Sequence, residues 1–175
     1  YKLKMQSDIL ENGVLEKVKT DSIDYEKDFE NWLENSPIVL LDDEFESTVL
    51  WIGRQVTAMV GDYGKYPDLI GLDADGDLII VELKKGKTPR EVIAQIFEYA
   101  AWGASLDYES LNEITQDYYR NDSNLKGKTL NEIFYEIFYD DSEEELKIQF
   151  NRNQKLYIVA EEISSIVKQV AIHLR

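Results

Sequence analysis

Two carboxylates and a lysine carry the chemistry that this sequence suggests. Asp68 stands before the short apolar run 69–72, and Glu82 and Lys84 stand at the end of a second apolar run. The segment 73–77, which reads Asp-Ala-Asp-Gly-Asp, separates the two runs. Two apolar runs around an Asp-Gly turn predict a β-hairpin. Since the start of the first strand then lies beside the end of the second, we expect Asp68 to neighbour Glu82 and Lys84.

These three side chains suit metal-assisted hydrolysis. Side chains alternate along a strand, so Glu82 and Lys84 are expected on one face. Two neighbouring carboxylates repel each other unless a cation lies between them. Oxygen ligands favour a hard ion that keeps several waters, which indicates Mg²⁺ or Mn²⁺. A lysine beside the ion can orient or deprotonate its water, or support the charge of a substrate phosphate.

The same residues resemble the motif of a known enzyme family. Pro67-Asp68 followed by Glu82-Leu83-Lys84 looks like the signature of the PD-(D/E)XK nuclease superfamily. Gln95 with Tyr99 is similar to the Gln-x-x-x-Tyr helix motif of its RecB-like and NucS-like branches. The resemblance covers roughly residues 24–106.

The resemblance implies an α/β fold with a restriction-endonuclease-like core, in which helices flank a central mixed β-sheet. It implies that Asp68 and Glu82 hold Mg²⁺ or Mn²⁺, together with the backbone carbonyl of Leu83. A glutamate on the first helix often completes the site in this family. Glu26 lies at the edge of the apolar stripe of that helix and is the better candidate, whereas Glu30 lies further round and is expected to be an exposed carboxylate.

The resemblance also implies roles for the motif lysine and for the helix that follows it. Lys84 would position or activate the attacking water, Gln95 would orient the surroundings of the metal or the nucleic-acid backbone, and Tyr99 would support Gln95. Gln95 and Tyr99 are four residues apart and therefore share a helix face. A purely structural role for Tyr99, as an aromatic side chain of the core, is the alternative.

A calcium-binding loop is another interpretation of the same stretch. If Gly71 is position one of an EF-hand, the later positions three, five, six and twelve fall on Asp73, Asp75, Gly76 and Glu82. Position one requires a carboxylate, and the flanking runs predict strands rather than helices. We therefore favour a solvated Asp-Gly turn over a calcium-binding structural domain.

The overall charge argues against binding nucleic acid through a broad basic surface. The formal net charge is -16, and such binding depends on neutralising phosphates. Basic residues nevertheless cluster around the motif, and those expected to contact nucleic acid, DNA above all, are Arg54, Lys85, Lys87 and Arg90. Arg54 lies inside a predicted strand, where an arginine needs a partner, so it is expected either to face the acidic site or a phosphate, or to be an edge charge.

Length and composition indicate a single globular domain over residues 1–175. The resemblance implies a nuclease-like core at about 24–106, with an extension at 107–175. Hydrophobic residues make up 43% of the chain, and no run approaches the length of a membrane span. The absence of cysteine excludes disulfides and thiolate metal sites and fits a cytoplasmic protein. No helix stop signal closes the sequence, so we expect a piece of a longer protein, with a partner domain or a homodimer.

The pattern of apolar residues predicts the remaining elements. In chain order these are an arm or strand around Ile9–Val18, a helix from Asp24 to Ser36, a strand at Val49–Val60 bulged at Gly53, a helix starting at Pro89 behind a capping box of Thr88 and Glu91, helices within 107–140, a strand at Leu156–Ala160 and a helix at Ile163–Leu174. The sequence thus predicts a metal-dependent nuclease acting on DNA. The alternative is a non-catalytic module that keeps the fold and binds nucleic acid or protein.

Overall fold

A four-stranded mixed sheet forms the centre of the protein. The computed structural model describes residues 9–11, 14–16, 26–36, 48–56, 58–60, 63–65, 67–139 and 148–174. The sheet has the order β3-β6-β7-β8, with β3 at Leu50–Arg54, β6 at Leu69–Leu72, β7 at Leu78–Lys87 and β8 at Gln154–Glu162. β6 is antiparallel to both β3 and β7, whereas β8 is parallel to β7.

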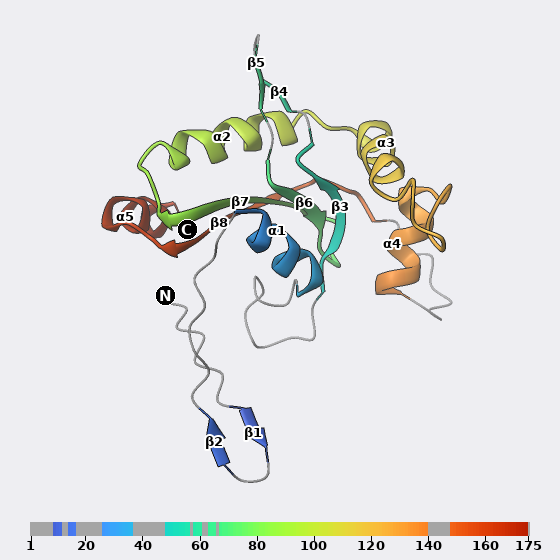
Figure 1. The fold of residues 1–175 in the computed structure, drawn as a ribbon. Coiled ribbons are helices and arrows are strands. Elements are labelled where there is room, and N and C mark those ends of the chain that lie inside the picture. The colour runs from blue at the N-terminus through green and yellow to red at the C-terminus, as the bar shows by residue number, and fades with distance from the viewer. Residues whose placement is uncertain are drawn as a thin grey trace.

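Helices cover both faces of this sheet. They are α1 (Glu26–Asn35), α2 (Val92–Gly103), α3 (Tyr108–Tyr118), α4 (Leu130–Phe138) and α5 (Ser165–His173). Figure 1 shows α2 along one face and α1 on the opposite face. The predicted α/β fold, with a central mixed sheet flanked by helices, is confirmed. Within the part of the chain that the structure describes, no helix is long and apolar enough to cross a membrane.

Alternation along β7 divides the apolar side chains into two cores. The core on the α2 face includes Leu78, Ile80, Ile96 and Tyr99. The core on the α1 face includes Leu33, Ile79, Val81 and Leu83. Because every second residue of a strand points to the same face, residue 82 belongs with Leu78 and Ile80 on the face that α2 covers.

The predicted hairpin between β6 and β7 is confirmed, but its turn is less exposed than expected. The carboxylate of Asp73 accepts hydrogen bonds from the backbone N–H groups of Asp75 and Asp77, both at 3.0 Å. Asp73 also forms an ion pair with Lys155 of β8. The prediction of a solvated turn is right for Asp75 and wrong for Asp73 and Asp77, which are buried because they bind the backbone and β8.

The EF-hand interpretation is wrong. Gly71 lies inside β6 and Glu82 inside β7, so the first and last ligand positions belong to paired strands. An EF-hand requires a loop between two helices, with its twelfth residue turned back toward the first. Here Gly71 pairs with Ile79, and Glu82 lies beyond the opposite end of β6.

The single strand predicted for Val49–Val60 is two strands in different sheets. β3 ends at Arg54, and β4 (Ala58–Val60) pairs instead with β5 (Tyr63–Lys65) in a separate ribbon. The break follows from Gln55, whose φ of 49° is left-handed and cannot continue a strand. The bulge predicted at Gly53 is confirmed by the register shift between Trp51 and Gly53.

The predicted start of α2 is wrong by one turn. The helix begins at Val92, after Glu91, and lacks a side-chain cap. Thr88 lies three residues before the N-cap residue Glu91, and its hydroxyl instead accepts a hydrogen bond of 2.8 Å from the backbone N–H of Ser164. A capping box is instead present at α4, between Thr129 and Glu132.

The other predicted elements are found with shifted ends. The strand at Leu156–Ala160 is the middle of β8, the last helix is α5, and residues 107–140 contain α3 and α4. Near the N-terminus, β1 (Ile9–Glu11) pairs with β2 (Val14–Glu16), where one strand or arm was predicted. In α1, Leu33 is buried, whereas its neighbour Trp32 is 50% exposed.

We expect the aromatic cluster under α4 to contribute strongly to stability. Phe134 is fully buried, and its ring contacts those of Phe138, Tyr139 and Phe150. Phe134→Ala should therefore lower the free energy of unfolding by about 3–5 kcal/mol, measured by urea denaturation. Phe97→Ala is the matched control, since Phe97 is 44% exposed and should cost less than about 1 kcal/mol. Equal losses in the two variants would contradict this account of the core.

Candidate active site

The hairpin brings the motif carboxylates together at one end of the sheet. The register pairs Leu69 with Val81, which puts Asp68 next to the segment that holds Glu82. The backbone N–H of Leu83 donates a hydrogen bond of 2.7 Å to Oδ2 of Asp68. The predicted neighbourhood of Asp68 and the end of β7 is therefore present in the structure.

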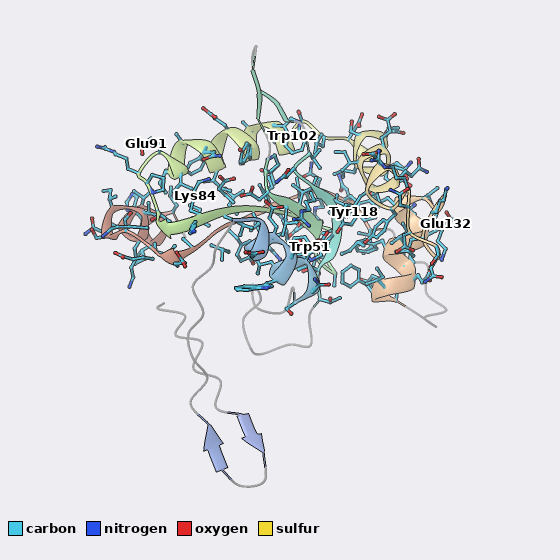
Figure 2. The ribbon with its side chains drawn as sticks, viewed as in Figure 1. Trp51, Lys84, Glu91, Trp102, Tyr118 and Glu132 are labelled. Carbon is cyan, nitrogen blue, oxygen red and sulfur yellow. The ribbon has the colours of Figure 1, made fainter. Side chains whose placement is uncertain are left out.

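Glu82 and Lys84 lie on the face of the sheet that α2 covers. Glu82 is only 1% exposed, and its Oε1 forms an ion pair with Nζ of Lys84. The side chain of Lys84 is 21% exposed, and Figure 2 shows it on the same side of the sheet as α2. A carboxylate so deeply buried requires a cation close by, and Lys84 provides one that also reaches the surface.

The face of α2 that bears Gln95 and Tyr99 is directed at these charges. Nε2 of Gln95 donates a hydrogen bond of 2.9 Å to the hydroxyl of Tyr99, which is 1% exposed. Burial is the main cause that raises the pKa of Tyr99; Gln95 and Lys84 lower it, whereas Glu82 and Asp68 raise it further. Tyr99 thus belongs to the core and also lies within electrostatic reach of all three motif residues.

The donor set fits a hard divalent cation, although it is small. Among the described residues, no group of three or more Asp, Glu, His or Cys side chains could hold a metal ion. Asp68 and Glu82 supply two carboxylates. The C=O and N–H of a strand residue point to the same neighbouring strand, so the carbonyl of Leu83 lies on the β6 side of β7, as its N–H does. Two carboxylates, one carbonyl and waters make an oxygen shell of the kind that Mg²⁺ accepts.

The predicted third carboxylate cannot be placed. Glu26 is the first residue of α1, but its side chain lies outside the described part of the structure. Glu30, one turn further along, is 2% exposed, so the expectation that it is an exposed helix carboxylate is wrong. Its two carboxylate oxygens accept hydrogen bonds from Arg54, the last residue of β3, and from Gln55.

A polar cluster between α1 and β3 is the feature that sequence reasoning missed. The guanidinium of Arg54 donates hydrogen bonds to Glu30 at 2.6 Å, Asn31 at 2.8 Å and Glu34 at 3.0 Å. Gln55 donates a further bond of 2.9 Å to Glu30. Arg54 therefore binds carboxylates of α1 rather than the Asp68–Glu82 pair, and its contact with nucleic acid stays a prediction. The available signal was an arginine inside a strand, which requires an acidic partner.

The same cluster extends to α3 through a tyrosine. The hydroxyl of Tyr118 donates a hydrogen bond to Glu34. Burial raises the pKa of Tyr118, and the hydrogen bond and negative charge of Glu34 raise it further. Helices α1 and α3 are thus joined by polar groups around the end of β3.

The predicted nucleic-acid-binding cations lie beside the site but differ in their surroundings. Lys85 and Arg90 are exposed. Lys87 is 62% exposed and forms an ion pair of 2.7 Å with Glu162 of β8. A surface pair of this kind is weak, so a phosphate could displace it.

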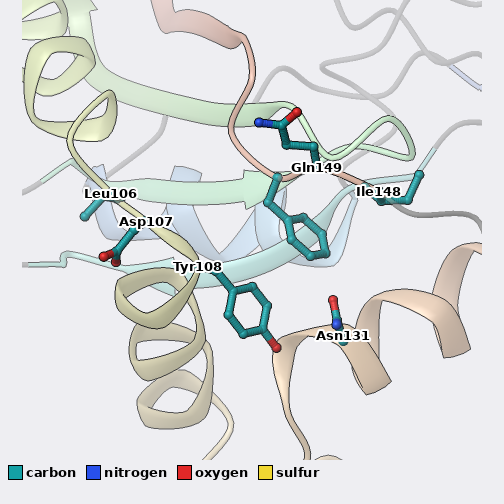
Figure 3. Close-up of a pocket in the computed structure, with 7 residues that line it drawn as sticks. Leu106, Asp107, Tyr108, Asn131, Ile148 and Gln149 are labelled. Atoms are coloured by element: carbon teal, nitrogen blue, oxygen red, sulfur yellow. The ribbon is translucent and has the colours of Figure 1, made fainter.

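A separate cavity lies at the other end of the sheet. Its volume is about 460 Å³, and Figure 3 shows it between the start of α3, the start of α4 and the segment before β8. The lining residues are Leu106, Asp107, Tyr108, Asn131, Ile148, Gln149 and Phe150. A side chain at Gly76, in the hairpin turn, would meet three of them, Ile148, Gln149 and Phe150, so this cavity lies at the turn end and is not part of the Asp68–Glu82 site.

The chain was compared with family models, curated proteins and solved structures, and similarity was found to solved structures. No protein-family model matches the sequence, and a search of curated proteins finds no match. The chain is similar to the crystal structure of a repair endonuclease from Pyrococcus abyssi, with 16% identity and a TM-score of 0.45 over 90% of this chain and 46% of that one. It is also similar to EndoMS in a complex named with dsDNA, with 14% identity and a TM-score of 0.45 over 91% and 46%. The chain spans less than half the length of either structure.

The raised pKa of Tyr99 predicts a loss of stability in alkali. Its pKa in the folded protein lies above the ordinary tyrosine value of 10.0, so it favours the folded state at lower pH, and this contribution is lost as pH rises above 10. Between about pH 10 and 11, the unfolding free energy of the native protein should fall more than that of Tyr99→Phe, by at most about 1.4 kcal/mol. Urea denaturation at several pH values measures the difference. Parallel pH profiles for the two proteins would show that Tyr99 is not held un-ionised.

Proposed function

We propose that this chain is a metal-dependent nuclease that hydrolyses phosphodiester bonds in DNA. The observation that carries the proposal is the hydrogen bond of the Asp68 carboxylate to the backbone N–H of Leu83, the residue between Glu82 and Lys84, together with the ion pair of Lys84 and Glu82. Gln95 and Tyr99 face the same charges from α2. DNA is proposed as the substrate because of the motif's resemblance to the RecB-like and NucS-like branches.

Asp68 and Glu82 would hold Mg²⁺ or Mn²⁺, with the carbonyl of Leu83 beside them. Such an ion lowers the pKa of a water and stabilises the negative charge that develops on a phosphate. The backbone N–H of Leu83 orients the carboxylate of Asp68 through Oδ2. The deep burial of Glu82 removes competing water from its carboxylate, which strengthens its attraction for any cation.

Lys84 would act directly on the reacting groups. Its side chain is 21% exposed while it remains paired with buried Glu82, so a scissile phosphate could approach it from the solvent. There it can stabilise phosphate charge or exchange a proton with the attacking water. Gln95 would hold this arrangement from α2, with its amide fixed by the hydroxyl of Tyr99.

Exposed cations at the same end of the sheet would guide the substrate. Lys85 and Lys87 lie two residues apart on β7, and Arg90 follows in the connection to α2. With a net charge of -16, the rest of the chain repels DNA. We therefore expect binding to depend strongly on salt and to be confined to this region.

A binding module without turnover is the second candidate. The acidic composition favours it, since the chain carries 35 acidic against 19 basic residues. In that case the protein would bind Mn²⁺ or a partner without cleaving DNA. The two candidates share the metal site and differ in the role of Lys84.

Lys84→Ala is the decisive variant. Labelled single-stranded and duplex DNA should be cleaved in Mg²⁺ or Mn²⁺ and left intact in EDTA. Lys84→Ala should lower the cleavage rate by about 100-fold or more, since general acid–base and electrostatic groups contribute on this scale. Lys126→Ala is the matched control, because Lys126 is an exposed lysine in the loop between α3 and α4 and should leave the rate unchanged.

Calorimetric titration with Mn²⁺ separates the two candidates. Asp68→Asn should weaken binding strongly, because the amide oxygen that replaces the carboxylate carries no negative charge to neutralise the ion. If the native protein binds Mn²⁺ but cleaves neither single-stranded nor duplex DNA, the result would support the binding module. Cleavage that is unchanged in Lys84→Ala would refute the proposed role of this lysine.

A further inference from the structure

The backbone of Gln55 is unusual at a position next to the candidate site. In the described part of the chain, the non-glycine residues with positive φ are Gln55, at 49°, and Asn151, at 57°. Asparagine tolerates this conformation well, whereas a glutamine there is strained by its Cβ. Such strain persists only where surrounding contacts hold the residue, and it marks places where geometry matters for function.

A buried carboxylate holds Gln55 in this conformation. Nε2 of Gln55 donates a hydrogen bond of 2.9 Å to Oε1 of Glu30, and Nε of Arg54 donates one of 2.6 Å to Oε2. Glu30 is 2% exposed and belongs to α1. Arg54 and Gln55 are thus each bound to one oxygen of the Glu30 carboxylate.

Gln55 in turn holds the main chain of Asp68. Its backbone N–H donates a hydrogen bond of 3.0 Å to the carbonyl of Asp68. This bond lies one step beyond Arg54 and Leu69, the last pair of the β3–β6 ladder. The carboxylate of Asp68 accepts from the N–H of Leu83 on the other side, at 2.7 Å. Asp68 is therefore held by β3 through its backbone and by β7 through its side chain.

We propose that Gln55 is a positioning residue for Asp68, and that its hydrogen bond to Glu30 sets the place of the Asp68 carboxylate. Gln55 is itself exposed, so burial of its side chain in the core does not explain its conformation. A glycine would adopt the same φ without strain but could not reach Glu30. The significance for catalysis rests on the proposed nuclease function, whereas the effect on the position of Asp68 does not.

Hydrogen exchange at Leu83 tests the position of Asp68 without any metal or substrate. In Gln55→Ala, the Leu83 amide should exchange about tenfold faster, because the carboxylate that protects it is no longer fixed. The amide of Val81, which belongs to the intact β6–β7 ladder, should keep its protection and show that the variant is folded. Gln116→Ala, the same change on the exposed side of α3, should alter neither amide.

Gln55→Asn separates the side-chain bond from the backbone conformation. Asparagine accepts a positive φ but is one methylene too short to reach Glu30. It should therefore accelerate exchange at Leu83 as Gln55→Ala does. In both variants, the affinity for Mn²⁺ measured by calorimetry should fall roughly tenfold, the usual effect of removing a group that orients a metal ligand.

The outcomes are distinct. Native-like exchange at Leu83 in Gln55→Ala, or in Gln55→Asn alone, overturns the proposal that the bond to Glu30 positions Asp68. Faster exchange at Leu83 in both variants supports it, even if the native protein neither binds Mn²⁺ nor cleaves DNA. That last result would refute the proposed function and leave the positioning of Asp68 established.

Discussion

The burial of the Glu82 carboxylate beside Asp68 is the constraint on which the candidate site depends. A charge with 1% exposure is costly in a protein interior unless another charge or polar group compensates it. Lys84 compensates Glu82, and the N–H of Leu83 compensates Asp68. Both compensating groups come from β7, which also carries Glu82, whereas Asp68 stands directly before β6. The apolar residues that alternate with them on β7 hold the strand at the centre of the sheet.

The chemistry at one end of the hairpin depends on the turn at the other. A slip of one residue between β6 and β7 would move Glu82 and Lys84 to the α1 face. The turn prevents this slip through hydrogen bonds within 73–77 and through the ion pair between Asp73 and Lys155. Asn153 adds a hydrogen bond of 3.0 Å to Asp77. The acidic residues of the turn, which resemble a calcium loop in sequence, thus fix the register of the strands.

Ion pairs within the chain limit which cations can contact a nucleic acid. Several cations are occupied by carboxylates of the chain itself, as in the pairs of Arg54 with Glu30 and of Lys155 with Asp73. These pairs join α1 to β3, and β8 to the hairpin turn. Cations used in this way are less available to phosphates. Any contact with nucleic acid must therefore be confined to a smaller part of the surface than the net charge of -16 alone suggests. The exposed residues around the end of β7 are the ones positioned for it.

The sequence alone determined the hairpin, the α/β class and the proximity of Asp68, Glu82 and Lys84. It could do so because turn chemistry and the alternation of apolar residues are local properties, readable within a few residues. The tertiary structure decided three other features, namely the break after β3 at Gln55, the hydrogen bond between Thr88 and Ser164, and the burial of Glu30. Each of these depends on a partner between 25 and 76 residues away, and no local pattern encodes such a contact. The local sequence of the hairpin therefore predicts where Asp68 lies. The contact of Gln55 with Glu30, in contrast, forms only when α1 packs against the sheet.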